Sequence, residues 1–490
     1  SSAASLGSLV VREAAFAVRG ADVNMARPNR RGYERITPET DAIGDIEDQQ
    51  NGLDPDGPDD ANAKSRLCGA ALQTRRSAGV FREVQCGDSD IDASFLRHIA
   101  GLRGVFSLWV LAQCMLQRSC DLAGRAYVTS TSSVVVSGFV TQWVFGHQDF
   151  DRPASLGHFY VRRLARTVPT AQLFICVTAL ITLFVGEANM GAEAAPIGAE
   201  RIARCVSFID AWLDVEGSCP DGAAWIVPVL LPSWLTFPWS RRLVARVAAV
   251  HGSVGLTFLA VSLMAASCGP AVLLFCLQHG LLTKRQRAVS QSWPPSHMAE
   301  FALGMVAAAA AHRQCVLMAP APSADGRLAR PQLPAPRHLR MLADGAAAMG
   351  LVLALVSALS PDTALDGGMS PTLAAHGLNV LVAMFLFASS ASAATTALDG
   401  GEGGGGLVAK VLALTALVSM GRYTFELYVL HQPISMLCEA LWGSRTKSAT
   451  SADWRGVATA AILGAGAVSW VELVSSPSTR RLSAFVARKL

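Results

Sequence analysis

Charged side chains are scarce in this sequence, and that scarcity excludes most soluble folds of its length. Only 16% of the 490 residues are charged, whereas 51% are hydrophobic. A soluble globular chain of this size carries more charge, so the composition indicates a membrane protein. Lysine and arginine (41) nearly balance aspartate and glutamate (37), and a net charge of +4 gives no electrostatic reason to expect nucleic-acid binding.

Paired metal ligands and internal repeats are also missing. The eleven cysteines include no Cys-x-x-Cys pair and no neighbouring histidine cluster at zinc-ligand spacing, so we predict no metal site. No repeat of useful length is visible, which counts against the inverted-repeat folds of secondary transporters. Because the sequence begins at Ser1 without a methionine, it leaves the organelle open.

Two of the cysteines, Cys205 and Cys219, flank a short polar stretch between apolar segments. A disulfide between them requires that this loop lie in an oxidising compartment. Two free thiols are the alternative, and the sequence does not decide between the two states.

Residues 1–93 form a polar stretch with no sustained apolar period, which predicts a largely disordered tail. Residues 94–490 contain recurring apolar runs of about 18 to 25 residues, each long enough for a helix to cross the hydrocarbon core of a bilayer. The expected fold is therefore an all-α, polytopic transmembrane helix bundle of ten to twelve helices. The candidate spans, one of which is interrupted by Pro228, Pro232 and Pro238, are 99–118, 127–146, 168–187, 222–239, 243–265, 268–283, 300–318, 341–360, 372–397, 406–420, 423–443 and 456–476.

The first span contains the segment Phe-Leu-Arg-His-Ile-Ala-Gly-Leu-Arg-Gly-Val-Phe-Ser-Leu-Trp-Val, residues 95–110. It resembles the opening membrane helix of the acyltransferase 3 family, in wording closest to the eukaryotic nose-resistant-to-fluoxetine-like branch. The family pattern is an arginine followed, after ten residues, by a histidine taken as the catalytic base. Arg103 matches the arginine, and Cys114 stands at the histidine position. Eleven residues of helix return to nearly the same face about 16 Å further along, so both side chains line one side of the helix.

Later segments resemble the same family in the same order. Residues 136–140 contain its Ser-Gly-Phe signature, and residues 159–169 contain its Arg-x-x-Arg signature, which falls on Arg163 and Arg166. The remaining matches are residues 295–305, which include Glu300; residues 420–433, which include His431 and Pro433; and the closing pair Glu472 and Pro477. Together the matches cover about residues 95–480, nearly the whole apolar part of the chain.

The resemblance implies that Arg103, Arg163 and Arg166 hold the phosphates of an acyl-CoA donor. Guanidinium groups suit this role because they bind phosphate oxygens in a bidentate manner. Arg163 and Arg166 also share one helical face, at positions i and i+3. Two ordinary interpretations stand beside this one: an interface arginine at position 103, and a cytosolic anchor formed by the other two.

Two departures from the family pattern concern the chemistry. Cys114 replaces the base, and Leu230 stands where the family has a glutamate. Apolar burial disfavours the thiolate that a nucleophilic cysteine needs, so His431 is the substitute to consider. A hydrogen bond between helices is the alternative role for His431. The candidate catalytic residues are therefore Cys114 and His431.

The resemblance implies an integral membrane enzyme that transfers an acyl group from acyl-CoA to a hydroxyl of a carbohydrate or lipid. It implies acyl-CoA as co-substrate and no bound cofactor, with Glu300, Glu426 and Glu472 as possible orienting groups. The alternative is a catalytically degenerate protein that keeps the bundle as a binding, lipid-handling or assembly subunit, since a fold does not fix a function. A transporter that relays protons through Glu426, His431 and Glu472 is a third alternative.

Overall fold

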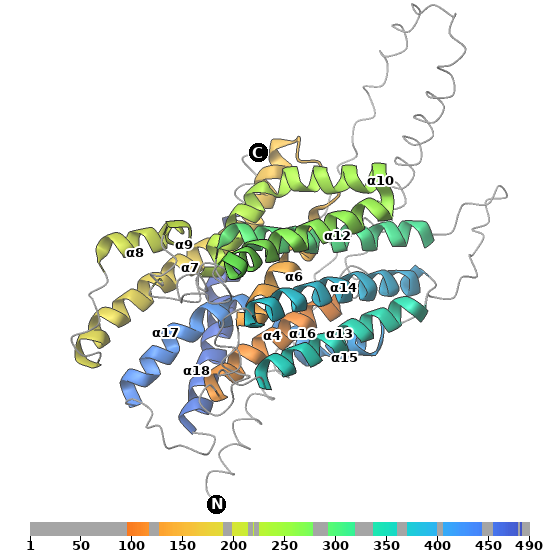
Figure 1. Cartoon of the computed structure of the whole chain (residues 1–490). Coiled ribbons are helices and arrows are strands. Elements are labelled where there is room, and N and C mark those ends of the chain that lie inside the picture. The colour runs from red at the N-terminus through yellow and green to blue at the C-terminus, as the bar shows by residue number, and fades with distance from the viewer. Residues whose placement is uncertain are drawn as a thin grey trace, which may run out of the picture. The chain divides into compact units, whose positions relative to one another are not determined.

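The computed structural model describes most of the apolar part of the chain, and all of these residues fall in one of the two units into which the chain divides, residues 77–490. The described ranges are 96–116, 127–189, 198–213, 219, 225–277, 293–318, 337–359, 370–398, 405–442, 454–478 and 481–482. Within these ranges nearly every residue is helical and none is in a strand, so the predicted all-α helix bundle is confirmed (Figure 1). The tail predicted for residues 1–93 lies outside the described residues.

The helices follow one another along the chain with short described connections or with gaps between the described ranges. The long ones are α4 (Arg97–Leu116), α6 (Tyr127–Phe145), α7 (Pro153–Asn189), α10 (Ile226–Leu277), α12 (Pro294–Met318), α13 (Arg337–Leu359), α14 (Ser370–Leu398), α17 (Thr424–Trp442) and α18 (Trp454–Trp470). The short ones are α8 (Ala199–Val206), α9 (Asp210–Leu213), α15 (Leu407–Leu412), α16 (Thr415–Gly421) and the π-helical turn η3 (Val471–Ser475).

Most predicted spans coincide with helices, because an apolar run can satisfy its backbone hydrogen bonds internally only as a helix. The bounds of α4, α6, α13 and α14 lie within a few residues of the predicted ones. In the described part of the chain, five helical segments are long and apolar enough to cross a membrane: Pro153–Phe184, Ile226–Gly269, Arg337–Leu355, His376–Thr396 and Gly456–Ser478.

The helix α10 corrects the prediction of three separate spans at 222–239, 243–265 and 268–283. Over the described part of these ranges, α10 consists of two helical segments that meet at a kink at Gly252, so two segments replace the three predicted spans. The four prolines of α10, Pro228, Pro232, Pro238 and Pro270, lie inside these segments. The helix bends at Gly252, whose φ of 63° and ψ of −144° are unfavourable for any residue with a side chain. The bend therefore occurs within the second predicted span and not between two of them.

The predicted span 406–420 is likewise divided, into α15 and α16. Asp344 of α13 fixes the start of α15, because its carboxylate accepts hydrogen bonds from the backbone nitrogens of Leu407 (3.0 Å) and Val408 (2.9 Å). A carboxylate at this position satisfies free backbone donors and interacts favourably with the helix dipole. The pattern of apolar residues could not predict this contact, because Asp344 lies on a helix about sixty residues earlier in the chain.

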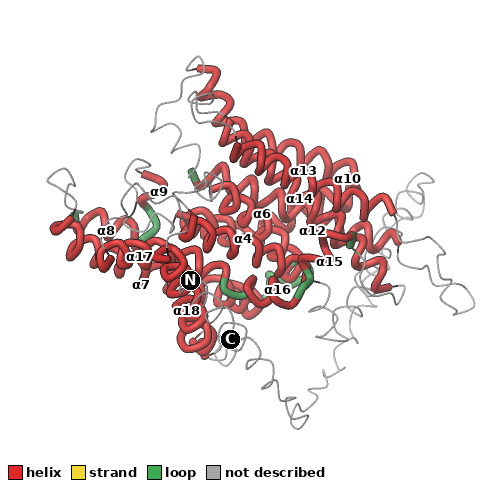
Figure 2. The backbone as a smooth tube through the Cα atoms, turned by 90° about the horizontal axis from the view of Figure 1, so that it is seen from below, coloured by secondary structure: helices red, strands yellow, loops and turns green. Residues whose placement is uncertain are grey.

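Helices α6, α12 and α14 lie side by side near the middle of the bundle (Figures 1 and 2). Two glycines let α6 and α12 approach closely. A methyl group on Gly138 would overlap the carbonyl oxygen of Phe301, and one on Gly304 would overlap that of Val135. Small residues at such crossings are typical of helix pairs in membranes. The contact brings α6 to the position from which it lines the cavity described below.

Cys205 and Cys219 are joined by a disulfide, with their Cα atoms 5.7 Å apart. Of the two alternatives that the sequence left open, the structure therefore has the bridged one. The end of α8 is held against α7, where Gln172 Nε2 donates a hydrogen bond to the carbonyl oxygen of Val206 (3.2 Å). Such a bridge persists only if this loop lies in an oxidising compartment.

Candidate functional site

The three arginines that the sequence singled out line one cavity, although they come from different helices. Arg103 belongs to α4, and Arg163 and Arg166 belong to α7. The cavity has a volume of about 240 Å³. Its other lining residues come from α4, α6, α7, α10 and α17: Phe106, Val110, Ser133, Val136, Ser137, Val140, Arg162, Thr167, Ile226, Leu230, Trp234, Thr424, Phe425 and Tyr428. That Arg103, Arg163 and Arg166 line the same cavity is observed, whereas their role in binding remains a prediction. We call this space the arginine cavity.

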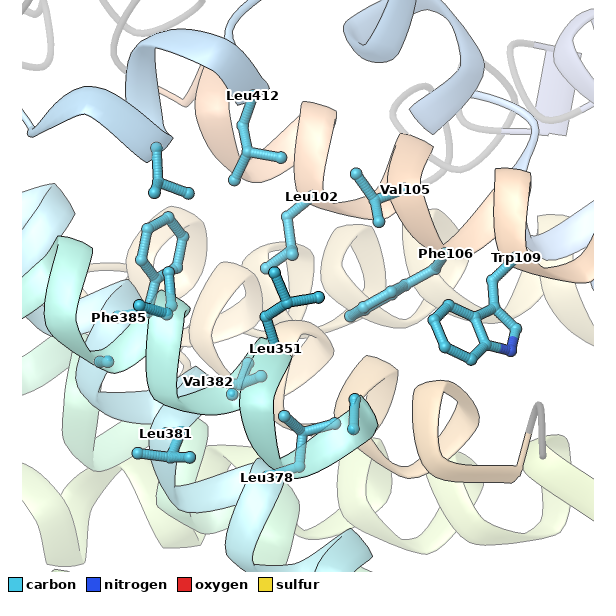
Figure 3. A pocket seen from close by; sticks show the side chains of 16 residues that line it. Leu102, Val105, Phe106, Trp109, Leu351, Leu378, Leu381, Val382, Phe385 and Leu412 are labelled. Atoms are coloured by element: carbon cyan, nitrogen blue, oxygen red, sulfur yellow. The ribbon is translucent and has the colours of Figure 1, made fainter. Parts of the chain in front are cut away.

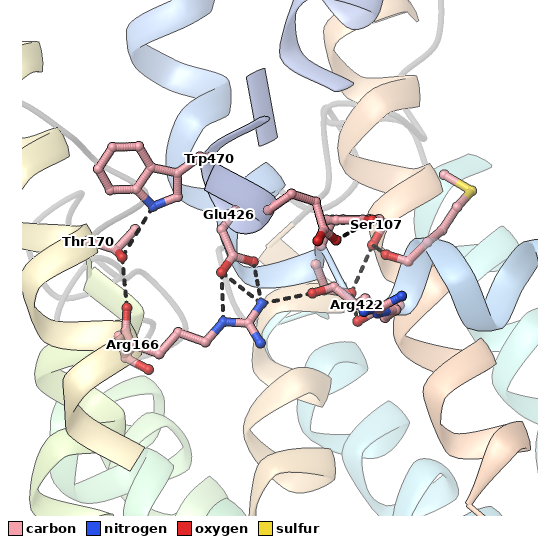
Figure 4. Close-up of polar contacts among 12 residues, drawn as sticks. Ser107, Arg166, Thr170, Arg422, Glu426 and Trp470 are labelled. Atoms are coloured by element: carbon pink, nitrogen blue, oxygen red, sulfur yellow. Dashed lines mark hydrogen bonds and ion pairs between the residues drawn. The ribbon is translucent and has the colours of Figure 1, made fainter. Parts of the chain in front are cut away.

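Hydroxyl groups fasten α4 to α17 beside Arg103. Thr424 Oγ1 donates a hydrogen bond to the backbone carbonyl of Arg103 (3.0 Å), and the Ser107 hydroxyl lies 2.8 Å from the Thr424 hydroxyl. Ser107 is one of the contacts that Figure 4 shows between these helices. Short polar side chains can form such bonds where two helices pack closely. The backbone that carries Arg103 is thereby fixed against the helix that carries Thr424, Phe425 and Tyr428.

Arg166 forms a bidentate ion pair with Glu426 (Figure 4). Its Nε donates to Glu426 Oε1 (2.8 Å) and its Nη2 donates to Oε2 (3.0 Å), and Nη2 also reaches the carbonyl oxygen of Arg422 (2.8 Å). The Glu426 side chain is fully buried, which makes a neutralising partner necessary. The carboxylate that was predicted to orient reacting groups therefore positions an arginine.

Arg103 and Arg163 have no such partner. Within the described part of the chain, neither side chain forms an ion pair, and the buried Nε of Arg163 has no hydrogen-bond acceptor. The guanidinium carbon of Arg163 lies 5.1 Å from the centre of the Phe145 ring, a cation–π contact that does not neutralise its charge. Both side chains are only partly exposed, and a cation in such a setting gains from a counter-ion, so the two guanidinium groups are available to a bound anion.

The rest of the arginine cavity is neutral. Hydroxyl groups come from Ser133, Ser137, Thr167, Thr424 and Tyr428, Trp234 adds an indole N–H, and the other lining side chains besides the arginines are apolar. Among the described residues, no carboxylate and no imidazole lines this cavity. The hydroxyl groups can donate to a bound anion, but none is a general base of the ordinary kind.

The two candidate catalytic residues lie further along their helices than the lining residues. His431 is three residues beyond Tyr428, and its Nδ1 donates to the carbonyl oxygen of that residue. Cys114 belongs to α4, four residues beyond the lining residue Val110, and its side chain lies outside the described part. Leu230, at the position of the family's glutamate, lines the cavity and presents an apolar surface to it. The catalytic roles of Cys114 and His431 remain predictions.

Glu300 belongs to a separate buried network. Its carboxylate lies 2.6 Å from His297 Nδ1 and 2.9 Å from His376 Nδ1, and it accepts a hydrogen bond from Asn379 Nδ2 (2.8 Å). Ser267 Oγ of α10 also donates to it (3.2 Å). The network joins α10, α12 and α14, and none of its members lines the arginine cavity. The sequence identified Glu300 but missed His376 and Asn379, whose only signal is a polar side chain within an apolar span.

The three groups proposed for a proton relay are separated from one another. Glu426 pairs with Arg166, Glu472 accepts a hydrogen bond from the Tyr423 hydroxyl (3.1 Å), and His431 bonds to the backbone of its own helix. No hydrogen bond among the residues that the structure covers joins any two of the three. The described contacts therefore give no support to the transporter alternative.

Comparison with known proteins gives one match. A family model described as an acyltransferase domain, Acyl_transf_3, matches residues 134–471, which is more than half of the chain. No curated protein and no solved structure matches the chain. The matched residues include Arg163, Arg166, Leu230 and Glu426, while Arg103 and Cys114 lie before them.

Proposed function

Since the chain belongs to the acyltransferase 3 family, we propose that it is a multi-pass membrane enzyme that transfers an acyl group from acyl-CoA to a hydroxyl of a carbohydrate or lipid acceptor. The five long apolar helices and the family together identify an integral membrane protein that is an acyltransferase at the family level. The donor, the acceptor and the number of spans are the parts that we propose.

The observation that carries the proposal is the unbalanced charge of the arginine cavity. Arg103, Arg162, Arg163 and Arg166 line it, and within the part of the chain that the structure describes only Arg166 is paired with a carboxylate, that of Glu426. The pyrophosphate and 3′-phosphate of coenzyme A would supply the missing negative charge, and guanidinium groups are the side chains best suited to bind phosphate oxygens. In this account Arg103 and Arg163 contact the donor directly, and Glu426 keeps Arg166 in place.

The reaction itself needs one proton transfer. The acceptor hydroxyl attacks the thioester carbonyl, its proton leaves, the carbon–sulfur bond breaks, and coenzyme A departs as a thiol after taking up a proton. Cys114 and His431 are the candidates for handling that proton, since they follow the cavity on α4 and α17. Both require that the thioester extend past Val110 and Tyr428, the cavity-lining residues that precede them on those helices.

Binding of coenzyme A to the purified protein in lipid nanodiscs tests the donor site. Arg163→Gln should weaken binding by about tenfold or more, because a lost charge-assisted bond in a desolvated site costs about 1.5–3 kcal/mol. Arg246→Gln is the matched control, since Arg246 is exposed on α10 and does not line the cavity. Equal affinity in the parent and in Arg163→Gln would reject the arginine cavity as the donor site.

Catalytic degeneracy is the alternative, and a specific observation favours it. The arginine cavity lacks a lining imidazole or carboxylate among the described residues, and Leu230 faces it. The protein would then bind an acyl-CoA or a lipid without turning it over. The Cys114→His variant distinguishes the two proposals: activity that appears only in this variant supports degeneracy, whereas acyl transfer by the parent protein excludes it.

A further inference from the structure

A second cavity adjoins the arginine cavity and differs from it in chemistry. Its volume is about 440 Å³, within the range of small-molecule sites. The lining side chains come from α4, α13, α14 and α15, and apart from the indole nitrogen of Trp109 they are apolar, with Leu102, Phe106, Leu351, Leu381 and Phe385 among them (Figure 3). We call it the apolar cavity. No charged or hydroxyl-bearing side chain lines it; the indole nitrogen of Trp109, which has no hydrogen-bond partner among the described residues, is the polar side-chain group in the lining.

The two cavities meet at one residue of α4. Phe106 lines both of them, while Arg103 faces the arginine cavity and Leu102 and Val105 face the apolar one. The helix therefore presents a cation on one side and hydrocarbon on the other, within a single turn. A ligand that occupies both spaces must carry an anionic part for the arginine cavity and an apolar part for the other cavity, with a linker long enough to connect them around Phe106.

The apolar cavity also lies between two helices that can span a membrane. Its α13 and α14 residues fall within Arg337–Leu355 and His376–Thr396. A hydrocarbon chain is the ligand whose transfer into such a space is favourable, because every buried methylene group contributes. We propose that this cavity holds the alkyl chain of the acyl donor, so that the protein uses long-chain acyl-CoA and not acetyl-CoA. This inference rests on the proposed function.

Gly350 of α13 offers a way to fill the apolar cavity without changing its chemistry. A Cβ atom placed there would lie 3.2 Å from Leu378 Cδ1 and 3.9 Å from Leu381 Cβ, two lining residues, so a larger side chain points into the space. The contact at 3.2 Å is with the end of a flexible side chain, which can move aside. Gly345 lies on the same helix, and a Cβ atom placed there would meet nothing within 4 Å, so it provides a matched control.

The test measures binding of coenzyme A, acetyl-CoA and palmitoyl-CoA to parent, Gly350→Phe and Gly345→Phe proteins in nanodiscs. Parent and Gly345→Phe should bind palmitoyl-CoA at least tenfold more tightly than acetyl-CoA. Gly350→Phe should lose that preference but keep its affinity for coenzyme A, which also shows that the variant is folded. If Gly350→Phe loses coenzyme A binding as well, Ala354→Phe fills the same cavity from the next turn and is judged by the same two criteria.

Two outcomes overturn the inference and leave the proposed function standing: equal affinity of the parent for acetyl-CoA and palmitoyl-CoA, or an unchanged chain preference in a filled variant that binds coenzyme A. A photoreactive phospholipid provides the remaining arm. If it labels α13 or α14 and palmitoyl-CoA fails to displace it, the cavity holds a bilayer lipid and the donor assignment is wrong. Absence of any binding of coenzyme A by the parent would instead reject the proposed function.

Discussion

The buried carboxylate of Glu426 has one role predicted from the sequence and a different one in the structure. From the sequence it was a candidate for orienting the reacting groups, because an acidic residue in an apolar helix is costly and therefore often functional. In the structure both of its oxygens accept bonds from Arg166. In the proposed donor site its contribution is therefore indirect, since it fixes Arg166 while Arg103 and Arg163 are the groups proposed to contact the anion.

Replacing Glu426 alone should destabilise the protein more than replacing both Glu426 and Arg166. Glu426→Leu leaves Arg166 without its partner, and we expect a loss of about 1–3 kcal/mol in the free energy of unfolding, at the lower end because Arg166 keeps 36% of its side chain exposed. The double variant Arg166→Leu, Glu426→Leu should recover part of that loss. Thermal unfolding in one detergent measures both. A double variant less stable than either single one would contradict this account.

The Glu300 network marks the limit of prediction at the residue scale. Its glutamate could be found, because it falls in a segment that resembles a family motif. Its partners His376 and Asn379 lie on a helix about eighty residues later, and no local pattern connects them. Such contacts arise from the packing of α10, α12 and α14, so only the folded chain brings them together.

Helices were easier to predict than their ends and interruptions. Apolar runs of sufficient length gave α4, α6, α13 and α14 nearly correct bounds, since the requirement for internal backbone bonds acts locally. The span predicted at 222–239 already included Pro228, Pro232 and Pro238, which neighbouring helices and local adjustments can accommodate. What the prediction missed is that this helix continues past residue 239 and is interrupted at Gly252 instead. The division of 406–420 was missed because the carboxylate that fixes α15 comes from α13.

The crossing of α6 and α12 should be sensitive to the smallest possible substitution. Gly304→Ala places a methyl group against the backbone of Val135, which cannot move aside as a side chain could. We expect a loss of about 1–3 kcal/mol from overpacking, seen as a lower midpoint of thermal unfolding. Gly464→Ala on α18 is the control, because nothing lies within 4 Å of its Cβ position. Equal midpoints of thermal unfolding for Gly304→Ala and Gly464→Ala would show that α6 and α12 can move apart without loss of stability.

The molecule as a whole exposes large apolar side chains along the helices that can span a membrane. Phe184, Val254, Phe258 and Met341 are each more than 70% exposed. Apolar surface on this scale is stable only when lipid covers it. Membrane insertion thus follows from composition, helix length and exposure together, and it could be predicted before any contact was known.

Extraction of membranes with alkaline carbonate provides the corresponding test. The protein should remain in the pellet, because carbonate removes proteins held by charge but leaves those whose apolar helices are inserted in the bilayer. A detergent should release it. Recovery in the carbonate supernatant would mean that the long apolar helices pack against other protein surfaces instead of lipid.

The candidate site was predictable in part. The spacing of Arg163 and Arg166 and the family motifs identified the cationic groups, and those groups do line one cavity. The lining by Leu230, the pairing of Glu426 and the apolar cavity behind Phe106 depend on which helices are neighbours, which spacing along one segment does not determine.

The bridge between Cys205 and Cys219 bears on how the protein should be produced. Synthesis in a host compartment rich in glutathione would leave both thiols reduced, and the segment after α8 would lose its covalent tie. A host that exposes this loop to an oxidising compartment is the safer source of material, and reducing agents should be left out of purification buffers.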